Sequence, residues 1–186
     1  NCIMEEILNG TILIADPFLK DPNFKRSTVF ICDYETAGTF GFVLNRKENL
    51  QLGDLLTGLE GCDFPVYYGG PVQMDSMHFL HQCPKLISGG VEITDGIFWG
   101  GNFEEVVSLL QKGKLKQQQI RFFLGYSGWG EGQLETELKD GSWLATSGNK
   151  GLVFHLNTDL IWRDAIKQLG GEYEQIINYP SDPQLN

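Results

Sequence analysis

The densest glycine cluster of the chain reads Gly125-Tyr126-Ser127-Gly128-Trp129-Gly130-Glu131-Gly132. An apolar strand is predicted just before it, over Ile120–Leu124, and a short helix just after it, over Gln133–Lys139. Because glycine adopts backbone conformations that other residues avoid, the cluster predicts a strand-to-helix loop with at least one glycine at positive φ. We expect Gly128→Val or Gly130→Val to destabilise the fold by a few kcal/mol through backbone strain.

Strands and helices follow one another irregularly in the rest of the chain. A hairpin is predicted from Ser27–Tyr34 and Phe40–Asn45, which flank a glycine-containing loop. One helix opens at Asn102 as N-cap and ends at Gly113, and another opens near Thr158. Further strands are predicted at Thr11–Ala15, Val66–Tyr68, Met77–Gln82, Val91–Thr94, Gly96–Trp99, Ser142–Ala145 and Leu152–His155, with a helical turn at Leu52–Leu56. This irregular order predicts an α+β fold with a mostly antiparallel sheet or open barrel.

Length and composition exclude several classes of protein, among them proteins with membrane-spanning helices. The 186 residues suit one domain spanning residues 1–186, and the net charge of −10 opposes direct DNA binding, which depends on Lys and Arg neutralising phosphates. The four cysteines include no Cys-x-x-Cys pair, so we expect free thiols in a reducing compartment. Apolar stretches fall far short of the ~20 residues that span a bilayer. A cytoplasmic protein without membrane association is therefore expected.

Two kinds of catalytic site can be tested against the glycine cluster. A serine nucleophile elbow needs G-x-S-x-G, but Trp129 occupies the last position after Ser127. The carboxylates of Glu131 and Glu135 share a helix face if both are helical, but no proton acceptor or metal is visible beside them. No catalytic residue is predicted.

A metal site is the next candidate. His78, His81 and Cys83 lie within six residues, and on a strand His81 and Cys83 share a face while His78 points away. Zinc needs three or four ligands, so two on one face do not make a site. The sequence predicts neither a metal nor a cofactor.

The motifs together carry a family resemblance. The run Gly125–Glu135, with Glu137, resembles the signature G-Y-x-G-W-x-x-G-Q-L-E-x-E of the bacterial AlgH/YqgE family. Four earlier segments resemble the family's other motifs in the same order: Gly10–Pro17, Phe24–Val29, Gly41–Arg46 and Tyr68–Val72. The chain departs from the family at Ser127, where Ala is frequent, and at Lys47, where Pro is common.

The resemblance implies a sheet curled into a barrel-like core with flanking helices, and no established reaction. Some family members are described as transcriptional regulators. We therefore expect a non-enzymatic regulatory or interaction protein, with an unknown protein partner or a small acidic ligand. The expected surface consists of Asn45, Arg46, Gly69, Gly70, Pro71, Gly125, Gly128, Trp129, Gly130, Gln133 and Glu135. The alternative is an enzyme or anion-binding protein that uses the Gly125–Gly132 loop as a nest of backbone amides and Arg46 as counter-charge.

Overall fold

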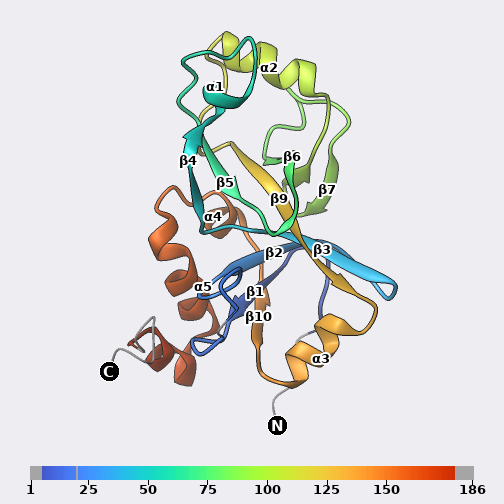
Figure 1. Cartoon of the computed structure of the whole chain (residues 1–186), viewed down its shortest axis with the longest axis vertical. Helices are drawn as coiled ribbons and strands as arrows, with labels where there is room; N and C mark the ends of the chain where they lie inside the picture. Colours follow the sequence, from blue (N-terminus) through green and yellow to red (C-terminus); the bar gives the residue numbers. More distant parts are fainter. Residues whose placement is uncertain (1–5, 20, 179–186) are drawn as a thin grey trace.

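The structure, a computed structural model, describes residues 6–19 and 21–178. Its described part forms one ten-stranded sheet with helices at its flanks (Figure 1). The strands are β1 (Thr11–Ala15), β2 (Thr28–Glu35), β3 (Gly38–Val43), β4 (Lys47–Gln51), β5 (Pro65–Tyr68), β6 (Val72–His81), β7 (Val91–Thr94), β8 (Ile97–Trp99), β9 (Ile120–Gly130) and β10 (Trp143–Ser147). The helices are α1 (Leu52–Leu55), α2 (Phe103–Gln111), α3 (Gln133–Lys139), α4 (Lys150–Val153) and α5 (Ile161–Leu169), with 3-10 helices η1 (Thr158–Leu160) and η2 (Gly171–Asn178).

Strand β9 organises the sheet. The strand order is β10-β1-β2-β3-β9-β6-β8-β7, with β5 paired to β9 and β4 to β5. All these pairs are antiparallel except β5 with β9. In Figure 1, β9 runs diagonally from the upper half, which α1 and α2 cover, to the lower half, where α3 and α5 lie. The predicted α+β fold with a mostly antiparallel, barrel-like sheet is confirmed.

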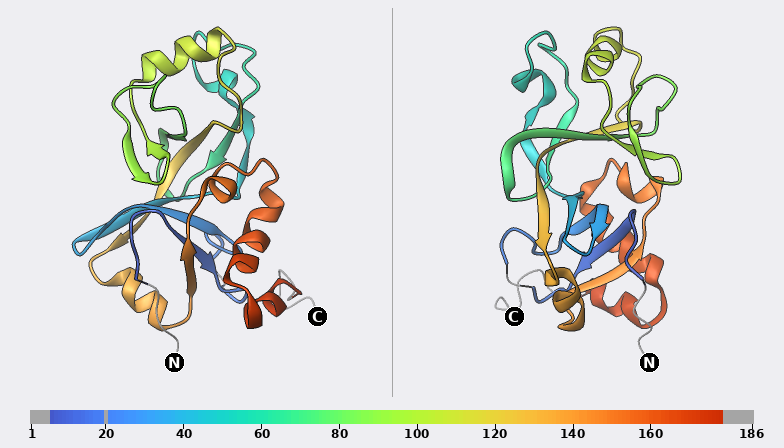
Figure 2. Two further views of the ribbon diagram at one scale, coloured as in Figure 1. Left: turned by 180° about the vertical axis from the view of Figure 1, so that it is seen from behind. Right: turned by 90° about the vertical axis from the view of Figure 1, so that its right-hand side faces the viewer.

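The two halves of β9 have different neighbours. Residues 120–126 pair with β6 on one edge, and residues 122–124 also pair with β5 on the other edge. Residues 127–130 pair with β3 instead. Gly125 stands between the halves with φ of +73°, a left-handed conformation that glycine adopts without strain. The partners of β9 change at Gly125, and the sheet as a whole curls into a half-barrel (Figure 2).

The link between β5 and β6 crosses the backbone of β9, because these two strands lie on opposite edges of it. A Cβ atom added to Gly70 would lie 2.2 Å from the carbonyl carbon of Tyr126. One on Gly69 would lie 2.3 Å from the oxygen of Gly125, and one on Gly125 would lie 2.4 Å from the oxygen of Gly70. We call Gly69, Gly70 and Gly125 the crossing glycines, because the backbones approach too closely for any side chain.

Hydrogen bonds stabilise the crossing of the β5–β6 link over β9. The Gly69 N–H donates to the Leu124 oxygen at 2.8 Å, and the Gly69 oxygen accepts from the Val43 N–H at 2.8 Å. The Ser127 hydroxyl also donates to the Gly69 oxygen, at 3.1 Å, and its side chain is fully buried. Ser127 therefore has a structural role, and the serine-nucleophile hypothesis has no geometric support.

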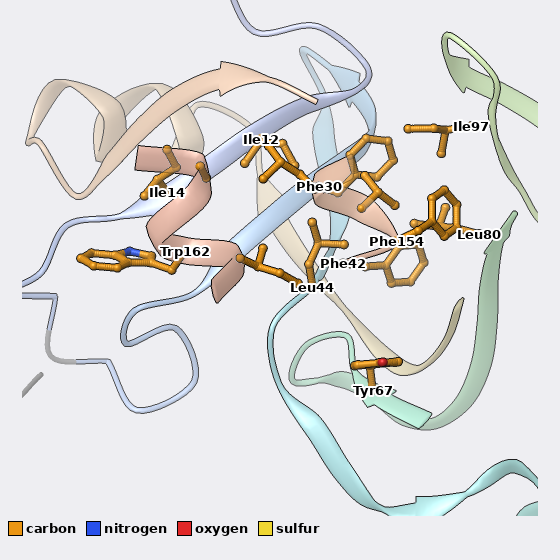
Figure 3. Close-up of a cluster of buried hydrophobic side chains, with 14 of the residues drawn as sticks. Ile12, Ile14, Phe30, Phe42, Leu44, Tyr67, Leu80, Ile97, Phe154 and Trp162 are labelled. Atoms are coloured by element: carbon orange, nitrogen blue, oxygen red, sulfur yellow. The ribbon is translucent and has the colours of Figure 1, made fainter. Parts of the chain in front are cut away.

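The main core lies between the concave face of the sheet and helices α4 and α5. Figure 3 shows Trp162 at one end, Phe30 and Phe42 in the middle, and Leu80 and Ile97 at the other end. A second core lies under α1 and α2, and a third lies on the opposite face of β1–β3 against α3. Burial of these side chains provides the main stabilisation of the fold, at about 25 cal/mol per Å² of apolar surface.

One cation is buried beside the main core. Arg121 of β9 is 1% exposed, and its guanidinium lies 4.1 Å from the centre of the Tyr67 ring. Its Nη1 donates to the Leu44 oxygen at 3.2 Å, and its Nη2 donates to the His155 oxygen. Burial lowers the pKa of Arg121 from its ordinary value to about 10. Arg121 thus ties together three segments that are distant in sequence.

Several element predictions are confirmed, and two local ones are not. Strands β1 and β7 have the predicted bounds. Asn102 caps α2 by accepting from the Glu105 N–H at 3.1 Å. The predicted strand at Leu152–His155 is wrong: the Asn149 side chain accepts from the Leu152 N–H at 3.0 Å and starts helix α4 there. Strand β4 was not predicted, since its residues are mostly exposed and lack an apolar pattern.

The interpretation of Gly125–Gly132 as a loop is also wrong in its extent. Strand β9 continues through Gly130, and only the last two residues of the cluster connect it to α3. Positive φ is confirmed at Gly125 and Gly132. Gly128 and Gly130 do not have positive φ, and a Cβ atom would lie 3.7 Å from its nearest neighbour at Gly128 and meet nothing within 4 Å at Gly130. The expected strain at these two positions is therefore absent.

Across residues 6–19 and 21–178, none of the helices has the length and apolar character needed to cross a membrane.

Candidate functional site

An open hollow of about 600 Å³ lies where the main core reaches solvent. Strands β3, β6, β8 and β9 line it with Gly38, Thr39, Phe40, Val72, His78, Trp99, Tyr126, Gly128 and Trp129. We call it the aromatic hollow. Its lining includes no Lys, Arg, Asp or Glu, and is mostly ring and backbone.

Four rings form the wall of the hollow. The Phe40 ring lies 5.1 Å from that of Trp99 and 6.0 Å from that of Tyr126, centre to centre. The His78 ring lies 6.3 Å from that of Trp99 and 5.9 Å from that of Tyr126. Such mostly edge-to-face contacts hold aromatic rings in fixed orientations. All four residues are half-buried, so the assembly is partly open to solvent.

Two residues of the lining, Gly38 and Gly128, carry no side chain, and we call this part of the lining the floor of the hollow. Strand register pairs Phe40 with Gly128, and Gly38 with Gly130. Directly paired residues and alternate residues of a strand share a face, so Gly38 and Gly128 lie on the same face as Phe40 and Tyr126. We call Gly38 and Gly128 the glycine shelf.

No backbone constraint explains the glycine shelf. Neither residue has positive φ, and added Cβ atoms would make only ordinary contacts, at 3.4 Å for Gly38 and 3.7 Å for Gly128. A glycine inside a strand weakens it and often marks close approach by a ligand or another backbone. The shelf therefore differs from the crossing glycines, which the fold itself requires.

His78 is held in one tautomer. The Ser76 hydroxyl donates its proton to the Gln73 oxygen at 2.7 Å, so its 3.2 Å contact with His78 Nε2 has the histidine as donor. The lone pair of His78 is then on Nδ1. Burial lowers the pKa of His78, which keeps the ring neutral at neutral pH.

His81, which the sequence places on one strand face with Cys83 as a possible metal ligand, has other partners. His81 is fully buried; its Nδ1 accepts from the Cys83 N–H at 3.1 Å, so its Nε2 donates to the Gly100 oxygen at 2.9 Å. Both ring nitrogens are occupied by backbone. Within the described ranges, no three His, Cys, Asp or Glu residues gather in a metal-binding arrangement.

These two histidines predict a loss of stability in acid. Burial lowers the pKa of both His78 and His81 below the ordinary value of 6.5, so the unfolded chain binds more protons as the pH falls through that range. Their contribution to stability is complete above pH 6.5 and is lost below it. Urea unfolding at about pH 7.5 and about pH 5.5 should show a smaller loss in the variant His78→Gln/His81→Gln than in the wild type. Equal losses would contradict this assignment.

The structure places the sequence-predicted residues in three groups. Asn45 braces a loop, accepting from the Thr28 N–H and donating to the Arg26 oxygen, each at 2.9 Å. Arg46 lies 5.7 Å from the centre of the Tyr68 ring and donates to the Lys25 oxygen at 3.3 Å. No ion pair joins Arg46 to any described carboxylate.

The second group is the crossing, where Gly69, Gly70 and Gly125 meet and Pro71 lies exposed beside them.

The third group extends from the hollow to α3. Gly128 and Trp129 line the hollow. The Gly130 N–H donates to the Gln133 side chain at 3.0 Å, and the Glu135 carboxylate accepts from the Tyr34 hydroxyl, a bond that lowers the pKa of Glu135. The second and third groups thus follow β9 into α3, whereas Asn45 and Arg46 lie in the loop between β3 and β4 and contact residues 25–28 and Tyr68. That they form a partner surface stays a prediction.

Most of the aromatic hollow was missed from sequence. The predicted site residues do not include Phe40, Trp99 or Tyr126, and His78 is a sequence candidate only as a metal ligand or as the partner histidine of a serine nucleophile. The available signal was the alternation of Tyr126, Gly128 and Gly130 along a strand. Interpreting the glycines as a loop excludes this strand alternation, so the shared face of these residues is not predicted.

Comparison with known proteins connects this geometry to a family. A family profile described as AlgH-like matches residues 12–174. The chain belongs to the AlgH-like family. The family resemblance of the sequence motifs is thereby confirmed.

Bacterial relatives match this AlgH-like chain along nearly its whole length. The UPF0301 protein of Chlorobium luteolum is 42% identical over 177 residues, which are 95% of this chain and 94% of the relative. The UPF0301 protein of Cytophaga hutchinsonii is 40% identical over 181 residues, 97% of this chain and 100% of the relative.

Two solved structures share the AlgH-like fold. The solution structure of the AlgH protein from Pseudomonas aeruginosa has a TM-score of 0.73 at 27% identity, covering 95% of this chain and 96% of the other. The crystal structure of protein DIP2367 from Corynebacterium diphtheriae has a TM-score of 0.77 at 19% identity, covering 95% of this chain and 94% of the other.

Proposed function

We propose that this AlgH-like chain is a non-enzymatic interaction protein whose recognition surface is the aromatic hollow. The observation that carries the proposal is the glycine shelf: Gly38 and Gly128 leave the floor bare although the backbone does not need glycine there. A bare floor beside a rigid wall of four rings suits a planar or narrow side chain of a partner.

Binding explains the hollow better than catalysis does. A Ser–His contact exists at its edge, but the Ser76 proton goes to the Gln73 oxygen and His78 donates to Ser76. A general base must instead accept the proton of the nucleophile. No described carboxylate accepts a hydrogen bond from the other nitrogen of His78, as an orienting residue of a catalytic triad would.

The anion-binding alternative has less support. Its nest of amides was expected in a loop at Gly125–Gly132, but β9 extends to Gly130, where the N–H donates to Gln133. Its counter-charge, Arg46, contacts Tyr68 and the Lys25 oxygen instead of pointing at the cluster. A regulatory role through a protein partner agrees with the net charge of −10, whereas direct DNA contact does not.

A panel of N-acetylated amino-acid amides tests the proposal, with phenylalanine, tyrosine, arginine and citrulline as side chains. We expect at least one planar side chain to shift the Trp99 indole N–H signal in ¹H–¹⁵N spectra. The indole of Trp162, which is buried and donates to the Ala15 oxygen at 3.1 Å, should not respond. The Gly128→Val variant should lose the response, because its side chain fills the shelf.

Gly130→Val is the matched control. It makes the same change in the same strand and on the same face, two residues beyond Gly128, at a position outside the lining of the hollow where a Cβ atom meets nothing within 4 Å. It should keep the Trp99 response, and both variants should keep the unfolding midpoint of the wild type. A response that survives Gly128→Val, or no response to any probe, would refute the proposal.

A further inference from the structure

We propose that the aromatic hollow binds an arginine side chain in a basic segment of a partner protein. This inference rests on the proposed function and adds the chemistry of the bound group. It is carried by two carboxylates at the rim of the hollow, by the half-buried aromatic rings of the lining, and by the lack of cationic side chains in the lining.

The carboxylates belong to the β2–β3 hairpin. Strand register pairs Asp33 with Phe40, and Glu35 with Gly38. Directly paired residues of antiparallel strands project on the same face, with Cβ atoms about 4.5–5.5 Å apart. Asp33 and Glu35 therefore stand on the side of the hairpin that carries the hollow, next to one wall residue and one shelf residue.

These two carboxylates are available to a ligand. Glu35 is exposed and Asp33 half-buried, and no described Lys or Arg forms an ion pair with either. Tyr34 between them points to the other face, where its hydroxyl donates to Glu135. The hairpin thus separates a tied carboxylate on one face from two available carboxylates on the other.

The charges around the hollow favour a cation as its ligand. Its lining has no Lys or Arg, its one histidine is neutral at neutral pH, and the whole chain carries a net charge of −10. A bound anion would meet two carboxylates and no counter-charge. A bound cation would meet carboxylates and the negative faces of aromatic rings, both of which attract it.

Among cationic side chains, the aromatic lining and the carboxylates favour arginine over lysine as the bound group. A guanidinium is planar, stacks on ring faces, and donates in a fork to a carboxylate, whereas an ammonium is a compact and strongly hydrated point charge. The methylene stem of arginine can cover Phe40 and Trp99 while its head reaches the rim. The Nδ1 lone pair of His78 is one further acceptor on a residue that lines the hollow.

The test compares the peptide acetyl-Gly-Arg-Gly-amide with its citrulline counterpart, which keeps the planar shape and lacks the charge. Trp99 indole shifts report binding. We expect the arginine peptide to bind at least about fivefold more tightly than the citrulline peptide. The Asp33→Asn/Glu35→Gln variant should weaken the arginine peptide to the level of the citrulline peptide.

The control Glu172→Gln/Glu174→Gln removes the same charge from exposed residues of η2, beside α5 and away from the hairpin. It should leave the preference for arginine unchanged, which separates a local effect from the overall charge.

The outcomes separate this inference from the proposed function. If both peptides bind equally and both require the bare shelf at Gly128, the hollow is a binding site but not for arginine, and the inference fails alone. Tighter binding of a lysine counterpart than of arginine would also overturn the inference alone. If the arginine peptide binds as well to Gly128→Val as to the wild type, the inference and the proposed function fail together.

Discussion

Gly70→Ala is expected to lower the free energy of unfolding by about 4 kcal/mol or more, enough to unfold much of the protein. Gly70 has φ of +152°, which L-residues rarely adopt, and its new Cβ atom would lie 2.2 Å from the carbonyl carbon of Tyr126. The neighbour is backbone inside a paired strand, so it has little freedom to move aside. Urea unfolding followed by circular dichroism measures the effect.

Gly128→Ala is the matched comparison and should change stability by no more than about 1 kcal/mol, with a gain as the expected sign. Both variants add one methyl group to a glycine of the family motifs. Only Gly70 lies where two backbones cross. Similar losses in the two variants would contradict the division into crossing and shelf glycines.

Arg121→Ala is the second variant with a large expected effect, a loss of about 3–5 kcal/mol. Burial of the charge is itself costly, because lowering the pKa of Arg121 to about 10 corresponds to about 3 kcal/mol. Its removal nevertheless leaves the oxygens of Leu44 and His155 without this donor, at about 1–3 kcal/mol each, and opens a cavity beside Tyr67.

Two further variants sharpen this prediction. Arg121→Met keeps most of the volume and removes the desolvated charge, so it should cost less than Arg121→Ala. The control Arg163→Ala removes an exposed arginine from α5 and should stay within about 0.5 kcal/mol of the wild type. A wild-type unfolding midpoint for Arg121→Ala would show that the buried guanidinium does not hold the three segments together.

The fold could be predicted from sequence where local signals agree with tertiary structure. Apolar runs predicted the bounds of β1 and β7. The Asn102 cap and Gly113 predicted the two ends of α2. Prediction failed at Leu152–His155, where the apolar pattern of a strand competes with the Asn149 cap of a helix. Short apolar runs cannot distinguish the two by pattern alone.

The site could not be predicted in the same way, because it depends on strand register. That Phe40 lies opposite Gly128, and Asp33 opposite Phe40, follows from pairings between residues far apart in the chain. The glycines of the signature also have two different roles that look alike in sequence. Only the crossing of β9 by the Gly69–Pro71 link shows that Gly125 is required by the fold and Gly128 is not.

The most direct test of the central claim is to map which backbone amides respond in ¹H–¹⁵N spectra when acetyl-Gly-Arg-Gly-amide is added. The claim predicts that the largest shifts fall on the aromatic hollow, at Gly38, Phe40 and Gly128, with no comparable shift around Arg46. Shifts that centre on Arg46 and Tyr68, or that spread evenly over acidic residues, would contradict it.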